Sequence, residues 1–233
     1  MTERLNHALA LIQAQARPQE LAGMARFGLV GDGRLGLAVP AMRRIARELG
    51  PDHDLALALW AQGFPDARIV ASMVAQPAKL TVAQMDAWAK GLVAWDVCDQ
   101  ACTNAFCRTP LAWGRVRKWA TRQDEFVRRA AFSLIAALSV HAKTASDAQF
   151  IALLPLIEAA AQDERNFVKK AVNWALRNIG KRNPALHASA VQCAQRIRAQ
   201  GSRSARWIAA DALRELNSEA VMARMQVLQA TAA

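Results

Sequence analysis

The chain has 233 residues, 53% of them hydrophobic, and its 30 Lys and Arg against 19 Asp and Glu give a formal net charge of +11. This length can bury a sizeable core. No run of 18 or more uncharged apolar residues occurs, which argues against a membrane span. The four cysteines form no C-x-x-C pair and the four histidines are scattered, so we expect no metal site. Reduced thiols and the absence of a signal-peptide layout favour a cytoplasmic protein, in the bacterial cytosol or nucleoid.

Apolar residues recur at helical spacing along the chain and no convincing strand pattern is present, so the sequence predicts an all-α fold. In the first half, Gly and Pro separate short helices, which we expect at residues 1–16, 40–49, 54–63, 67–74 and 82–90, and residues 21–27 form a short apolar segment. Thr81 is a plausible N-cap for the last of these. The segment GLVGDGRLGLAVP contains Gly31-x-Gly33-x-x-Gly36, formally a dinucleotide fingerprint. Because no strand precedes it, we expect a loop that binds no cofactor.

The next helix begins near Trp95 in the segment AWDVCDQACTNAF. One face of it is predicted to carry Trp95, Asp99, Cys102 and Phe106. Burying an unpaired carboxylate among apolar side chains is costly. Asp99 therefore either hydrogen-bonds to a neighbouring helix or faces water, or it has a functional role.

In the second half we expect helices at residues 110–121, 124–140, 147–161 with a kink at Pro155, 166–180, 184–199 and 202–217. Residues from about 220 to 233 are predicted to be a frayed tail. In helix 124–140, Val127 and Leu134 lie on the predicted core stripe, and Arg129 and Ser133 lie opposite it.

The helix at 166–180 has two distinct faces. One stripe is apolar: Val168, Val172, Ala175 and Ile179. The opposite stripe is basic and contains a tryptophan: Lys170, Trp174, Arg177 and Lys181. Trp174 either packs against the next helix of a stack or meets a ligand that favours both positive charge and a π surface, as nucleic acid does.

The positive charge is unevenly distributed. Residues 1–107 hold 10 basic and 10 acidic residues, whereas residues 108–143 have a net charge of +6 and residues 163–214 a net charge of +8. A charge run is usually a solvated face, but two segments with cations at matching helical positions favour a shared surface for a polyanion.

Internal repetition supports that interpretation. EFVRRA at 125–130 aligns with NFVKKA at 166–171 at an offset of 41 residues, and ALR at 175–177 recurs at 212–214. Offsets near 40 in a helical chain predict two-helix repeats of the HEAT type, stacked as a right-handed α-solenoid with a concave basic face. Equivalent helices would then project Arg129, Lys170 and Arg206 into that face, where spaced cations suit a duplex backbone.

Three segments, WDVCD (95–99), EFVRRAAF (125–132) and NFVKKAVNWALR (166–177), resemble the DNA alkylation-repair glycosylases built from HEAT-like repeats, the AlkD type. The resemblance runs over nearly the whole chain. It implies an enzyme that removes cationic N3- and N7-alkylated purines from duplex DNA without flipping the base. It also implies a catalytic Asp at Asp99, lesion-flanking tryptophans at Trp95 and Trp174, and a backbone-binding arginine at Arg129.

Together with the basic stripes, these assignments predict a catalytic set of Asp99, Trp95 and Trp174. They also predict a DNA-binding set of Arg129, Lys170, Arg177, Arg206 and Phe27. Two departures from the family pattern leave the lesion range open: Ala94 stands where an aromatic residue is frequent, and Phe27 stands where a tyrosine follows M-A-R.

We therefore expect one repeat domain over residues 1–233, with an N-terminal helix at about 1–17 and the tail at about 220–233. It is expected to act as a monomer on alkylated double-stranded DNA, without metal, cofactor or membrane. Two alternatives remain open: a non-catalytic DNA-binding repeat protein, and a helical-repeat adaptor for protein partners.

Overall fold

A computed structural model describes residues 2–231 of the chain. Within that range it consists of α-helices and short 3-10 helices and contains no strand, which confirms the predicted all-α fold. The chain forms two compact units, one extending to Ala112 and one beginning at Trp113, and each is described by itself. The prediction of a single domain stays a prediction.

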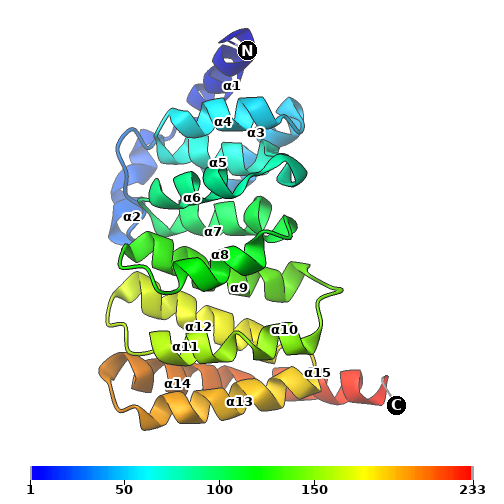
Figure 1. The fold of residues 1–233 in the computed structure, drawn as a ribbon. Coiled ribbons are helices and arrows are strands. Elements are labelled where there is room, and N and C mark those ends of the chain that lie inside the picture. The colour runs from blue at the N-terminus through cyan, green and yellow to red at the C-terminus, as the bar shows by residue number, and fades with distance from the viewer. Residues whose placement is uncertain (1, 232–233) are drawn as a thin grey trace. The chain divides into compact units, whose positions relative to one another are not determined.

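The first unit is a set of short paired helices (Figure 1). Its elements are α1 (Thr2–Ala14), η1 (Pro18–Glu20), α2 (Leu21–Arg26), α3 (Val39–Leu49), α4 (His53–Ala61), α5 (Pro65–Val74), η2 (Pro77–Lys79), α6 (Val82–Lys90), α7 (Trp95–Asn104) and η3 (Phe106–Arg108). Helix α5 packs against α3, α4 and α7. Helices α4 and α6 are also in contact, because Trp60 of α4 stacks on Trp88 of α6 with ring centroids 4.1 Å apart.

Local sequence explains where several of these helices begin. Prolines stand in the first turn of α3 and α5, where the missing N–H removes no intrahelical bond. Asp52 caps α4 by accepting from Leu55 N. Thr81 and Gln84 form a reciprocal capping box at α6, which confirms the predicted N-cap.

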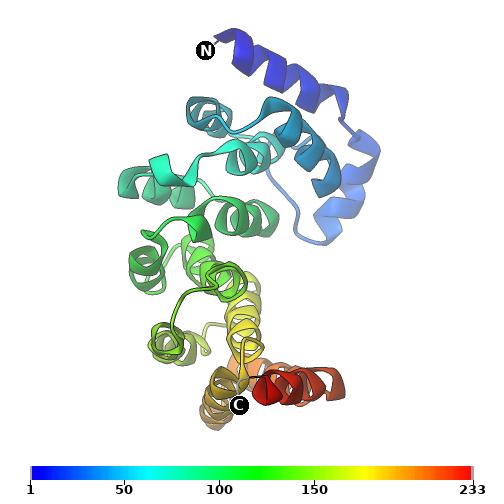
Figure 2. The same ribbon diagram turned by 90° about the vertical axis from the view of Figure 1, so that its right-hand side faces the viewer.

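The second unit also consists of paired helices, some of them longer than those of the first unit (Figure 1 and Figure 2). Its elements are α8 (Ala112–Trp119), α9 (Glu125–His141), α10 (Asp147–Ile151), α11 (Leu154–Ala160), α12 (Asn166–Gly180), α13 (Pro184–Ala199), α14 (Arg203–Leu216) and α15 (Glu219–Ala230). Helix α12 packs between α9 and α14, and α13 packs against both α12 and α14. Helices α9, α12 and α14 are therefore equivalent members of successive pairs.

The packing at the end of α12 is tight. A Cβ added at Gly180 would lie 2.7 Å from Leu216 Cδ2 and 2.9 Å from Ala190 Cβ. Glycine at this position allows α12 to approach α13 and α14 closely.

Two predictions about secondary structure are wrong. Residues 147–161 form two helices, α10 and α11, because Pro155 lies in the first turn of α11 and begins a new helix there. Residues predicted as a frayed tail form α15 as far as Ala230. Residues 232–233 of that predicted tail lie outside the described residues.

Candidate nucleic-acid interface

In the first unit, α7 presents Trp95 and Asp99 one helical turn apart. Both side chains are partly exposed, while Val97, Cys98 and Cys102 of the same helix are buried. The predicted stripe is thus divided: its tryptophan and acid reach the surface, whereas Cys102 and Phe106 lie in the core with no exposed area. Burial, a hydrogen bond with Cys98 and the negative charge of Asp99 raise the pKa of the Cys102 thiol, so this thiol stays protonated next to the acid.

The glycine-rich segment is a loop that is tied to α7. The indole Nε1 of Trp95 donates a 2.9 Å hydrogen bond to the carbonyl of Phe27. The guanidinium of Arg34 binds both carboxylate oxygens of Asp96, at 2.8 and 2.9 Å. The Arg34 side chain is only 4% exposed, so a bidentate ion pair fixes the loop at the first turn of the helix.

A second anchor holds the same loop to α5. Asp66 is fully buried and accepts hydrogen bonds from Leu35 N at 2.8 Å and Leu37 N at 3.0 Å. Gly36 has φ +86°, and a Cβ there would lie 2.3 Å from the carbonyl oxygen of Arg17. The glycines therefore serve a tight structural loop, and no strand precedes it in residues 2–231.

Apolar side chains are exposed around this loop. Phe27 is 74% exposed, and Val30 and Val93 are about half exposed. Large exposed apolar side chains next to a partly exposed tryptophan are unusual for a solvated surface, and they suit contact with a ligand.

In the second unit, the two predicted faces of α12 are confirmed. Val168 and Val172 have no exposed area, whereas Trp174 is partly exposed and Lys170 is exposed. Arg206 of the equivalent helix α14 is also exposed. Trp174, Lys170 and Arg206 are thus accessible to a ligand.

Arg129 of α9 does not lie on the open face where the sequence predicted it. It is only 5% exposed and its Nη1 donates a 2.7 Å hydrogen bond to the carbonyl of Phe167. Ser133 is fully buried as well. The expectation that both residues lie opposite the core is therefore wrong, because α12 covers this side of α9. Contact of Arg129 with a phosphate stays a prediction.

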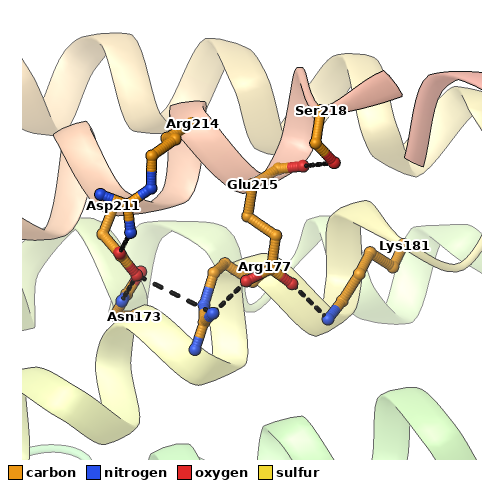
Figure 3. Close-up of polar contacts among 7 residues, drawn as sticks. All are labelled: Asn173, Arg177, Lys181, Asp211, Arg214, Glu215 and Ser218. Carbon is orange, nitrogen blue, oxygen red and sulfur yellow. Dashed lines mark hydrogen bonds and ion pairs between the residues drawn. The ribbon is translucent and has the colours of Figure 1, made fainter. Parts of the chain in front are cut away.

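Arg177 belongs to a network of polar contacts between α12 and α14 (Figure 3). We call this network the ion-pair ladder; its members are Asn173, Arg177, Lys181, Asp211, Arg214 and Glu215. Arg177 pairs with Glu215 and lies 3.8 Å from Asp211 Oδ2.

Two further contacts complete the ladder. Asn173 Nδ2 donates to Asp211 Oδ2 at 2.6 Å, and Lys181 Nζ donates to Glu215 Oε1 at 2.6 Å. The predicted DNA-binding residue Arg177 is thus already neutralised by acids of the next repeat.

These contacts set the ionisation of the ladder. Partial burial acts to raise the pKa of Glu215, but hydrogen bonds from Lys181 and Arg177 outweigh it and hold that pKa below its ordinary value. Glu215 is therefore a carboxylate at neutral pH, and it reduces the positive potential of this part of α12.

The acids of the ladder and the residues that anchor the glycine-rich loop were not predicted from the sequence. A signal for the ladder is present in the sequence: Asn173 to Asp211 and Arg177 to Glu215 are both separations of 38 residues, close to the repeat offset. No comparable local pattern points to Arg34 or Asp66.

Neither a metal site nor a membrane span is found in the part of the chain that the structure describes. No group of three or more His, Cys, Asp or Glu side chains could hold an ion there. No helix within residues 2–231 is long and apolar enough to cross a bilayer.

A model of the DNA alkylation repair enzyme family matches residues 8–216. One solved structure comes from a family of proteins related to the HEAT-like repeat DNA glycosylases, with affinity for branched DNA structures. It is 20% identical, covers 82% of both chains and has a TM-score of 0.73, which shows a shared fold.

A designed armadillo repeat protein in complex with a (KR)4 peptide is 13% identical, covers 96% of this chain and 88% of its own, and has a TM-score of 0.35. No curated protein sequence matches the chain significantly.

Proposed function

Because the chain belongs to the DNA alkylation repair enzyme family, we propose that it is a DNA N-glycosylase for cationic N3- or N7-alkylated purines in duplex DNA. The observation that carries this proposal is the pair on α7: Trp95 and Asp99 are partly exposed and lie one turn apart, in the segment that resembles the glycosylase motif. The exposed Lys170 and Arg206 support contact with the DNA backbone.

In the proposed reaction the C1′–N bond of the damaged nucleotide breaks, and its electron pair leaves with the purine, which becomes neutral. The alkylated purine is already cationic, so it needs little protonation to leave. The deoxyribose acquires oxocarbenium character, and the Asp99 carboxylate stabilises this positive charge. The same carboxylate orients a water, whose oxygen bonds to C1′ and whose proton passes to Asp99.

The tryptophans act on the same charge. A π face favours a nearby cation by about 0.5–2 kcal/mol, and the indole rings of Trp95 and Trp174 would flank the sugar and the base. Neither role requires a flipped base or a cofactor.

A second candidate is a non-catalytic DNA-binding protein. It is favoured by the structural relative whose family has affinity for branched DNA structures. The basic residues serve both candidates, but an acid at Asp99 opposes the binding of a polyanion, whereas the glycosylase mechanism uses it.

Base release by the wild-type protein tests the proposal. We expect free 7-methylguanine from a duplex that carries this base, and no uracil from a matched duplex that carries uracil, because uracil is an uncharged leaving group. Binding to both duplexes without release from either would contradict the glycosylase and support the second candidate. Release of uracil at a comparable rate would contradict the mechanism that depends on a cationic base.

A further inference from the structure

The second unit contains a cavity of about 430 Å³ at the C-terminal ends of α9 and α12. Four cations line it: Lys143, Lys181, Arg182 and Arg224. We call it the basic pocket. None of these four residues belongs to the DNA-binding set predicted from the sequence.

Two of the cations are held in place. Arg182 donates from Nη1 to Ser139 O at 2.6 Å and from Nη2 to Ala142 O at 3.2 Å, and its guanidinium lies 4.3 Å from the ring centroid of Phe150. Lys181 is held by its hydrogen bond to Glu215. The carbonyls at the C-terminal end of α9 would repel an anion, but Arg182 already satisfies two of them.

The other two cations have no partner. Lys143 and Arg224 are exposed, and within residues 2–231 their side chains form no hydrogen bond or ion pair. Two acids act on the cations of the pocket. Glu215 forms ion pairs with both Lys181 and Arg177, and the charge of Asp147 acts on Arg182. Cations therefore outnumber acids around the cavity, and an anion would balance the excess.

The position of the pocket relates it to the proposed function. Asn178 and Lys181, which line the pocket, follow Trp174 by one and two turns on the same face of α12. At 1.5 Å per residue, Lys181 lies about 10 Å along the helix axis from Trp174. A duplex that runs along α12 would cover that distance in about three nucleotides of one strand.

We propose that the basic pocket binds a backbone phosphate of DNA about three nucleotides from the damaged base. The inference rests on the proposed function, in which Trp174 flanks the lesion. Arg182 and Lys181 supply fixed positive charge, and Lys143 and Arg224 contact the phosphate from the rim. The Asn178 amide nitrogen donates one hydrogen bond to Ala136 O at 3.3 Å and has a second N–H for the phosphate. A free phosphorylated ligand offers the same chemistry, and the experiment below separates the two sources.

The first arm compares Lys143→Ala/Arg224→Ala with the charge-matched control Lys79→Ala/Lys90→Ala, whose residues are exposed in the first unit. Affinity for an undamaged duplex is measured at several salt concentrations. Each lost phosphate contact lowers the magnitude of the slope of log K against log salt by about 0.9. Because the pocket is proposed to hold one phosphate, we expect a slope smaller by about 0.9 in the pocket variant. We expect no change in the control. Equal slopes in the two variants would overturn the proposal.

The second arm titrates inorganic phosphate into the wild type and the pocket variant by calorimetry. Phosphate binding that depends on Lys143 and Arg224, together with unchanged DNA affinity, would assign the pocket to a free phosphate and overturn the DNA proposal. Because both arms avoid damaged bases, a wild type that binds DNA through the pocket but releases no base would contradict only the glycosylase.

Discussion

Trp95 Nε1 donates a 2.9 Å hydrogen bond to the backbone carbonyl of Phe27. One residue further along α7, Asp96 binds the guanidinium of Arg34. The loop that carries the exposed Phe27 and the helix that carries Asp99 are therefore fixed to each other at two points.

Replacing Trp95 with Phe keeps an aromatic ring and removes the hydrogen bond. A net loss of about 1 kcal/mol corresponds to about a fivefold lower rate if the bond positions the ring for excision. Single-turnover base release measures this rate. Trp207→Phe serves as control, since the Trp207 indole N–H makes no hydrogen bond within residues 2–231. Equal rates for wild type and Trp95→Phe would exclude a positioning role for the bond.

Asp66→Ala should destabilise the first unit strongly. The change leaves the buried amides of Leu35 and Leu37 without an acceptor, and each orphaned donor costs about 1–3 kcal/mol. We expect a loss of about 2–6 kcal/mol in the free energy of unfolding, measured by urea denaturation. Asp32→Ala, in the same loop but exposed, should change it by less than about 0.5 kcal/mol. Similar values for the two variants would show that the Asp66 contacts do not hold the loop.

Arg129→Ala tests a structural and a DNA-binding role together. Its loss leaves the Phe167 carbonyl without this donor, so we expect a loss of about 1–3 kcal/mol in the free energy of unfolding. If Arg129 also contacts a phosphate, the slope of log K against log salt for DNA binding falls by about 0.9, while Arg129→Lys keeps the slope. Destabilisation with an unchanged slope would leave Arg129 with a structural role alone.

The lowered pKa of Glu215 predicts how the stability of the fold depends on pH. Its pKa in the folded protein is held below the ordinary value of about 4.5, so the ionised form stabilises the fold. This contribution is fully present above pH 4.5 and is lost as the pH falls through the lowered pKa. Urea midpoints of wild type and Glu215→Gln should therefore converge between pH 6 and pH 3.

The control for this pH series is Glu20→Gln, which changes an exposed acid. Its midpoint should follow that of the wild type at every pH. A difference between wild type and Glu215→Gln that persists unchanged to pH 3 would mean that the contribution of Glu215 to stability does not depend on its ionised form.

Periodicity predicted the parts of the fold that depend on local pattern. In α12 the apolar stripe with Val168 and Val172 is buried and the stripe with Trp174 is accessible, because the 3.6-residue repeat alone decides which side of an amphipathic helix faces the core. Thr81 was identifiable as an N-cap because its partner Gln84 is three residues away. Pro155 was misjudged, because a proline in a helical pattern is compatible both with a kink and with a new helix.

Contacts between residues far apart in the chain could not be predicted from the pattern of one segment at a time. Arg129 was expected on an open face, but its hydrogen-bond partner is a backbone carbonyl 38 residues away, and a carbonyl leaves no trace in the sequence. Asp66 likewise binds backbone amides. Arg177 was identified as basic, but its neutralisation by Glu215 follows only from the register between α12 and α14.

The most direct test of the central claim is the rate of 7-methylguanine release by Asp99→Asn, measured in single turnovers and compared with wild type and Asp54→Asn. Asp54 is an exposed acid on α4 and serves as a matched control. We expect Asp99→Asn to keep its affinity for DNA and to lose release by about 10²–10⁴-fold, whereas Asp54→Asn should match wild type. Release by Asp99→Asn at the wild-type rate would remove Asp99 from the mechanism and contradict the proposed glycosylase reaction.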